Sequence, residues 1–421
     1  MAHPLPRLAE RHEVTAISFG GNSSRMQQTD ELIGGSLRET PVVALLHVGF
    51  VFIGIVNTLL GPILPLLSAR WRLDDAGAGA LFFVQSAGAI LGSALSGLLI
   101  KRFGFLPLLA AGFSLMAAGT AGLGFQSGVA GAFSIFGGGV SLGLTIPTIN
   151  LLISELNVGR RAAALNLLNL AWGVGAVSGP LLVPTLSRSV GFTVALVCIA
   201  TPLIVIGILI GRRSVYIPAA VGAGEATRSL AIRLWLTPYA LLTAALVFVN
   251  IGTESAIGGW IASYVQRLGP SSQLGWAIAP ALFWAGLLTG RATAPFILRR
   301  VRETLMVLIG MFVAVGGLLV ILLSTKTGTV LFGVSLAGLG LAAVFPTTIA
   351  IFTERFGHDA TRLTGTLFIL AGLGAAVFPW LVGLASFHYG ALRAGLVVPL
   401  ISGALMIVLH TAIMASLASR K

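Results

Sequence analysis

Charged residues and cysteine are scarce in this sequence. Only 9% of the 421 residues are charged, whereas about 25% is usual for soluble domains. With 56% hydrophobic residues, a chain of this length cannot bury its apolar surface in a soluble fold, so its solvent must be lipid. The one cysteine, Cys198, excludes an intrachain disulfide and a cysteine metal site. Because it lies inside an apolar run, we expect Cys198 to be a small buried side chain.

Features that define other protein classes are also missing. No run of the form G-x-x-x-x-G-K-[ST] provides a phosphate site for ATP. One cysteine and scattered histidines supply neither a nucleophile with its base nor a metal cluster, so we predict no enzyme, no catalytic residue, no metal and no cofactor. The net charge of +13 comes without a basic face interleaved with aromatic residues, so nucleic acid is not a predicted partner.

Long apolar runs, in contrast, fill most of the chain. A helix needs about 20 apolar residues to cross the hydrocarbon core. We predict an all-α integral membrane protein with twelve transmembrane helices, at 41–68, 76–100, 106–126, 128–154, 161–187, 191–213, 237–265, 274–299, 304–324, 328–353, 359–387 and 390–416. A polar connection at 214–236 separates two six-helix bundles, 41–213 and 237–416, and residues 417–421 form the C-terminus.

The distribution of lysine and arginine predicts the orientation. With both termini inside, the inner segments hold 19 of these residues and the outer loops hold 6, while Arg291 lies inside a span. Positive residues favour the cytoplasmic side. We therefore expect a multi-pass protein of the cell (inner or plasma) membrane with both termini cytoplasmic. Residues 1–40 lack the apolar core of a cleavable signal and are interpreted as a disordered cytoplasmic tail.

The two bundles repeat each other at fixed offsets. An offset of 199 relates Pro147, Thr148, Glu155, Gly175 and Pro180 to Pro346, Thr347, Glu354, Gly374 and Pro379. An offset of 198 relates Ala87, Gly88, Gly92, Lys101 and Arg102 to Ala285, Gly286, Gly290, Arg299 and Arg300. Two parallel repeats of six spans predict two bundles that face each other across a central cavity.

One loop carries a family signature. The stretch Gly97-Leu-Leu-Ile-Lys-Arg-Phe-Gly104 resembles the G-x-x-x-D-R-x-G motif of major facilitator transporters, with Lys101 in place of the aspartate. Within that superfamily the chain is similar to the fucose–galactose–glucose:proton symporter group. The stretches that carry this similarity are Asn57-Thr-Leu-Leu-Gly-Pro62, Asn166-Leu-Leu-Asn-Leu-Ala-Trp-Gly-Val-Gly175 and Glu254-Ser-Ala-Ile-Gly-Gly-Trp260. The resemblance implies the major facilitator fold and solute transport by alternating access.

The resemblance also implies a gate at the cytoplasmic corners of the two bundles. Its predicted residues are Lys101, Arg102, Glu155, Arg161, Glu354 and Arg362. The alternative for pairs such as Glu155 with Arg161 is a solvated loop pair, worth about 0–1 kcal/mol. Both interpretations stay open at this point.

Two charged residues lie well inside predicted spans. Glu254 is the one acid and Arg291 the one base at lipid depth. A charge near the bilayer centre costs at least about 2.5–3.5 kcal/mol, and a carboxyl group that a proton can neutralise would remove that cost while it moves. We predict that Glu254 couples transport to a proton or to sodium and that Arg291 pairs with it in one conformation. A static structural pair is the alternative.

Amide and indole groups inside the spans suit a sugar, which has hydroxyls at its edge and an apolar ring face. Asn166, Asn169 and Trp172 share one helix face at a spacing of three residues, and Asn250 and Glu254 share another. The predicted substrate-binding residues are Asn57, Gln85, Asn166, Asn169, Trp172, Asn250, Trp260 and Trp284. For each residue alone, an interhelical hydrogen bond or a packing contact is the alternative.

These observations predict a secondary active transporter that carries a monosaccharide, hexose-like, in symport with a proton. The expected partners are a small polar solute and the lipid bilayer, and we expect the chain to act as a monomer. The alternative function is proton-coupled efflux of small amphipathic compounds by antiport, which requires a wider and more aromatic cavity.

Overall fold

The computed structural model describes residues 41–124, 128–213, 234–269, 273–357 and 360–418. The predicted tail at 1–40 and residues 214–233 of the predicted connection lie outside the described residues, as do the last three residues. Contacts within the chain separate Met1–Ala44 from Leu45–Lys421. Both predicted bundles therefore belong to one compact unit, apart from the first few residues of the first helix.

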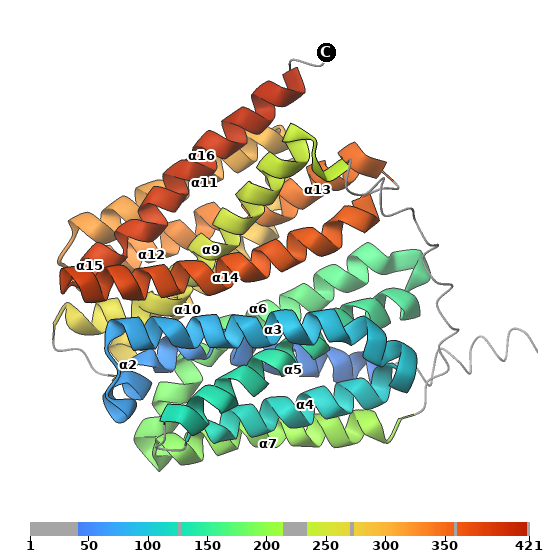
Figure 1. The fold of residues 1–421 in the computed structure, drawn as a ribbon, viewed down its shortest axis with the longest axis vertical. Helices are drawn as coiled ribbons and strands as arrows, with labels where there is room; N and C mark the ends of the chain where they lie inside the picture. Colours follow the sequence, from blue (N-terminus) through green and yellow to red (C-terminus); the bar gives the residue numbers. More distant parts are fainter. Residues whose placement is uncertain (1–40, 125–127, 214–233, 270–272, 358–359, 419–421) are drawn as a thin grey trace, which may run out of the picture. The chain divides into compact units, whose positions relative to one another are not determined.

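The described residues fold into helices joined by short connections (Figure 1). The first helix is Pro41–Asn57. The N-terminal half continues with α2 (Leu60–Trp71), α3 (Asp75–Phe103), α4 (Phe105–Gly122), α5 (Gly128–Leu156), the short 3-10 turn η1 (Val158–Arg160), α6 (Arg161–Val190) and α7 (Phe192–Gly211). The C-terminal half consists of α9 (Pro238–Arg267), α10 (Gln273–Ile297), α11 (Glu303–Leu323), α12 (Thr327–Leu341), α13 (Val344–Phe356), α14 (Ala360–Tyr389), α15 (Leu392–Gly395) and α16 (Val397–Ala418).

The helices match the predicted spans closely. Ten helical segments of the described chain are long and apolar enough to cross a membrane, and the bent pair Pro41–Asn57 and Leu60–Trp71 makes an eleventh. The one predicted span left over is the eighth, 274–299, which corresponds to α10, a helix of 25 residues that is not among them. Its two tryptophans, two prolines and Arg291 lower its mean hydropathy. The all-helical, multi-span fold class is confirmed.

Two predicted spans are broken near their middles, because proline has no N–H to give to the carbonyl four residues earlier. The first span bends by 43° at Thr58 and Leu59, just before Pro62. The tenth span, predicted as one helix at 328–353, divides into α12 and α13 at Ala342, four residues before Pro346. The Ala342 carbonyl is thereby left without its helical donor.

Equivalent glycines in the two halves make equivalent close contacts. In the N-terminal half, Gly88 of α3 lies against the backbone of α5 at Phe136. In the C-terminal half, Gly286 of α10 lies against the backbone of α12 at Ser335. A side chain at either glycine would overlap with the facing carbonyl oxygen, so the repeat in the sequence is a repeat of helix packing.

The helix ends fall into two groups. We call the end that carries Phe103, Gly211 and Ala360 the linker end, and the opposite end, which carries Asp75 and Tyr389, the far end. The two halves meet along α3 and α14, from Asp75 and Ser386 at the far end to Ile90 and Gly372. In Figure 1 these two helices run side by side and separate toward the linker end. The halves are thus joined at the far end.

Two arginines near the far end bind helix C-termini within their own halves. Arg70 donates to the carbonyl of Gly124 after α4, and Arg393 donates to the carbonyl of Leu322 in the last turn of α11. Positive side chains stabilise the negative end of a helix dipole. These contacts give a structural reason for basic residues in loops that the sequence analysis predicts to lie outside, where the charge rule expects few. The expected burial of Cys198 was wrong: on α7 its side chain is exposed.

Candidate functional site

An acid and a base from neighbouring helices lie together inside the C-terminal half. Glu254 on α9 is only 8% exposed, and its Oε2 lies 4.0 Å from Nη2 of Arg291 on α10. Among the described residues, this Oε2 accepts no hydrogen bond. The two groups are thus close enough to attract each other strongly in a low dielectric, but they do not form a hydrogen-bonded salt bridge.

The guanidinium of Arg291 lies near Glu254 and also contacts a backbone carbonyl at the break in the tenth span. Its Nε donates to the Ala342 carbonyl at 3.4 Å. Pro346 leaves this carbonyl without a donor from its own helix. A proline in one helix thus supplies an acceptor for an arginine in another, and this acceptor lies beside the acid that the sequence singles out.

Asn250 lies one turn before Glu254 on the same face of α9. Its side chain is 1% exposed, and within the described part of the chain neither amide atom has a hydrogen-bond partner. An unpaired buried polar group costs about 1–3 kcal/mol. Asn250 and Glu254 therefore place three unsatisfied polar atoms within one turn of a buried helix, which is unfavourable for stability alone.

Two tryptophans join the halves beside this region. Trp172 on α6 and Trp284 on α10 meet edge to face, with ring centroids 5.6 Å apart. The predicted aromatic plane of Trp260 is enclosed instead: the side chain is 0% exposed, and its Nε1 donates to the Pro379 carbonyl at 2.8 Å. In this conformation Trp260 packs between helices, whereas Trp172 and Trp284 lie at the boundary of the halves.

The remaining predicted substrate residues lie on the N-terminal half. Asn166 and Asn169 on α6 are exposed, and Asn169 donates to the Leu165 carbonyl of its own helix at 2.9 Å. Asn57 is exposed at the bend of the first span, and Gln85 on α3 is half-buried. The structure therefore places the predicted polar groups on both halves, with the charged pair in the C-terminal half alone.

The predicted gate residues all lie at the linker end. Glu155 pairs with Arg161 at 3.8 Å across the corner between α5 and α6, within one half. Lys101 and Arg102 are exposed, and Arg102 lies over the ring of Phe103. Glu354 is exposed at the end of α13, and the side chain of Arg362 lies outside the described residues. The described contacts of this set are local to each half.

An ion pair that the sequence analysis missed joins the two halves at the far end. Asp75, the first residue of α3, accepts two hydrogen bonds from Arg267 at the end of α9, at 2.8 and 2.5 Å. Ser386 of α14 donates to the same carboxylate at 2.5 Å. The position of an acid directly before the predicted span 76–100 is the only sequence signal for Asp75, because its partners are 192 and 311 residues away.

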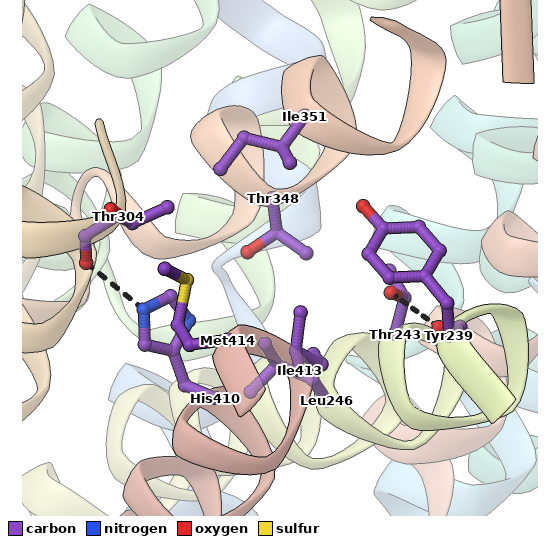
Figure 2. Close-up of a pocket in the computed structure, with 9 residues that line it drawn as sticks. All are labelled: Tyr239, Thr243, Leu246, Thr304, Thr348, Ile351, His410, Ile413 and Met414. Carbon is purple, nitrogen blue, oxygen red and sulfur yellow. Dashed lines mark hydrogen bonds between the residues drawn. The ribbon is translucent and has the colours of Figure 1, made fainter. Parts of the chain in front are cut away.

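A small cavity lies elsewhere in the C-terminal half (Figure 2). Tyr239 and Thr243 of α9, Thr348 of α13 and His410 of α16 contribute its polar groups. His410 is bound through Nε2 to the Thr304 carbonyl at 2.9 Å. This cavity contains no predicted site residue, so it is separate from the Glu254–Arg291 site.

The comparison with known families decides the identity of the fold. Residues 46–379 match the family model of the Major Facilitator Superfamily. The chain belongs to this superfamily. It is therefore a multi-span membrane transporter and not an enzyme, as the sequence analysis predicted. No curated protein sequence matches the chain significantly.

The solved structures with the same fold belong to transporters of different kinds. The crystal structure of a bacterial homologue of the human lysosomal transporter Spinster, inward-facing and occupied, superposes with a TM-score of 0.74 at 13% identity, covering 90% of this chain and 97% of the other. The nucleoside transporter NupG gives 0.70 at 16% identity, covering 90% and 98%. A D-xylose–proton symporter gives 0.69 at 16% identity, covering 88% and 97%. At such identities the likeness shows the shared fold of this major facilitator protein.

Proposed function

We propose that this major facilitator protein is a secondary active transporter that carries a monosaccharide together with a proton. The observation that carries the proposal is the Glu254–Arg291 pair, held at 4.0 Å inside the C-terminal half. A carboxylate beside a guanidinium forms a charge pair, and a protonated carboxyl does not. Loading Glu254 with a proton therefore changes the charge of the site and releases Arg291.

The polar residues favour a sugar as the solute. Asn166, Asn169 and Trp172 lie on one helix face in the N-terminal half, and Trp284 faces Trp172 from the other half. Asn250 adds a buried amide with both donor and acceptor unused among the described residues. A hexose offers hydroxyls to such amides and a ring face to an indole. Asn57 and Gln85 are further proposed ligands, in line with the resemblance to the fucose–galactose–glucose:proton group.

The way in which the halves join supports the proposal of alternating access. The far end is held by Asp75, Arg267 and Ser386, and the linker end carries the proposed gate residues. We take the linker end as cytoplasmic, because most lysine and arginine residues lie there. This conformation then corresponds to a carrier that is closed on the outside, and Lys101, Arg102, Glu155, Arg161, Glu354 and Arg362 would approach one another in the opposite state. The chain would act as a monomer.

Efflux of amphipathic compounds is the competing function. Spinster, nucleoside and sugar carriers share this fold, so the fold does not choose among them. The test is uptake into proteoliposomes from a panel of labelled hexoses and pentoses, with pH and sodium gradients imposed separately. Accumulation of a sugar driven by the pH gradient supports the proposal. Proton-driven movement of lipophilic cations, with no sugar accumulated under either gradient, would establish the efflux function in its place.

A further inference from the structure

The proline and freed carbonyl beside Arg291 have a counterpart in the other half, where the helix α5 continues without a break and the donor is different. Pro147 of α5 leaves the Gly143 carbonyl free, just as Pro346 leaves the Ala342 carbonyl free. In the N-terminal half, Ser93 of α3 donates its hydroxyl to Gly143 at 3.2 Å. In the C-terminal half, Arg291 occupies the position that corresponds to Ser93, since the two are 198 residues apart.

The two halves share the backbone contact but differ in the charge of the side chain that donates to it. Both halves have a proline, a freed carbonyl and a donor from the neighbouring helix, so the arrangement belongs to the repeated fold. A hydroxyl is sufficient to satisfy the carbonyl, as Ser93 shows. An arginine at the same place adds a positive charge, and among the described residues it is this donor that has an acid 4.0 Å away. The arginine therefore has a task beyond satisfying the backbone.

We propose that Pro346 is a positioning residue for proton coupling: the Ala342 carbonyl that it frees holds Arg291 back from Glu254. Nε is engaged with Ala342, so the guanidinium cannot offer the edge formed by Nε and Nη2 to the carboxylate for a bidentate pair. The ion pair stays at 4.0 Å without a hydrogen bond, and Glu254 remains able to take up a proton. The inference rests on the proposed function and identifies what keeps the pair apart.

Arg291 is the charged group that faces Glu254 among the described residues. Helix α9 packs against α2, α10, α12, α13, α14 and α16. The other described titratable groups on these helices and on α9 belong to Arg70, Tyr239, Tyr264, Arg267, Glu354, Arg355, His388, Tyr389 and His410. Arg70, Arg267 and His410 have partners elsewhere, at Gly124, Asp75 and Thr304. Of these groups, Arg291 is therefore the one whose position most directly affects the proton affinity of Glu254.

The test is the pH dependence of sugar uptake by Pro346→Ala. Alanine supplies an N–H to the Ala342 carbonyl, which releases Nε of Arg291 and lets the guanidinium close on the carboxylate. A closer positive charge stabilises the ionised form, so the pH of half-maximal uptake should move to lower pH by about 1 unit. Pro147→Ala is the matched control, because it supplies the equivalent N–H to the Gly143 carbonyl beside Ser93 and should leave the midpoint unchanged.

The outcomes separate this inference from the proposed function. An unchanged midpoint in Pro346→Ala, or an equal shift in Pro147→Ala, would overturn the positioning role even if Glu254 proves essential for coupling. If Pro346→Ala transports too slowly, the same midpoint is read from the pH dependence of sugar binding to the purified protein. A failure of the proposed function itself would be seen in a different measurement, as undiminished sugar accumulation by Glu254→Gln.

Discussion

Trp172 and Trp284 face each other edge to face across the boundary of the two halves, with ring centroids 5.6 Å apart. One indole comes from α6 and the other from α10, so each half contributes one ring. Gly173, next to Trp172, faces Leu288 of α10, so the same two helices also pack closely there. The pair therefore closes the boundary between the halves at one point, and under the proposed function its indoles would offer flat surfaces to a solute when the halves part.

We expect a measurable coupling between these two indoles. In a double-mutant cycle on thermal unfolding, Trp172→Ala and Trp284→Ala should show an interaction free energy of about 0.5–1.5 kcal/mol. Each single change should also weaken sugar binding. Trp235→Ala serves as the control partner in a second cycle with Trp284→Ala, because Trp235 contacts Phe352 within its own half. Strictly additive effects of Trp172 and Trp284 would contradict the contact.

Glu254→Gln should abolish accumulation of solute against its gradient and leave downhill exchange at least partly active. Glutamine keeps the size of the side chain but cannot release a proton. Labelled-sugar uptake with and without an imposed pH gradient measures both activities. Glu303→Gln is the control, because Glu303 is an exposed acid in the first turn of α11. A Glu254→Gln protein that still concentrates sugar rules out Glu254 as the coupling group.

Breaking the far-end ion pair should open that end of the protein. Asp75→Asn and Arg267→Gln remove charge-assisted hydrogen bonds that join α3 to α9, and a bidentate arginine–carboxylate pair is among the stronger surface pairs. Spin labels at the exposed positions Arg188 and Lys326, in a Cys198→Ser background, report the separation of the halves at the far end. A population with longer distances should appear in both variants.

The control for this prediction lies one residue away. Asp74 accepts a hydrogen bond from the Gly77 amide of its own helix at 2.7 Å and therefore caps α3 without joining the halves. Asp74→Asn should leave the distance distribution as in the wild type. Equal changes in Asp74→Asn and Asp75→Asn would mean that the start of α3, and not the contact between halves, sets the separation.

Gly374→Ala should destabilise the protein by about 1–3 kcal/mol, because the added methyl group would overlap with the Phe248 carbonyl of α9 and overpack the contact. Gly365 on the same helix is exposed and has no atom within 4 Å of an added Cβ, so Gly365→Ala should be neutral or stabilise by up to about 1 kcal/mol. Thermal unfolding in the same detergent measures both. Equal stability of the two variants would show that close packing at Gly374 is unimportant.

The membrane class, the approximate positions of the spans and the internal repeat were determined by the sequence itself. These properties are local or periodic: lipid requires long apolar runs, and a helix needs a fixed length to cross it. The isolation of Glu254 and Arg291 at lipid depth is equally visible in the sequence, since it depends only on where the spans begin and end. Pro346 marks the position of the break in the tenth span, but the equivalent Pro147 lies inside the unbroken α5, so proline alone does not decide where a span breaks.

Only the tertiary structure decided which of these groups meet. Asp75 and Arg267 are 192 residues apart, and the sequence around either residue does not indicate the other. The same holds for Arg291 and the Ala342 carbonyl, 51 residues apart, and for Trp172 with Trp284. Helix periodicity gives the face on which a side chain lies, but the rotation and contact of one helix against another depend on packing over its whole length. That packing enclosed Trp260 while it left Trp172 and Trp284 at the boundary of the halves.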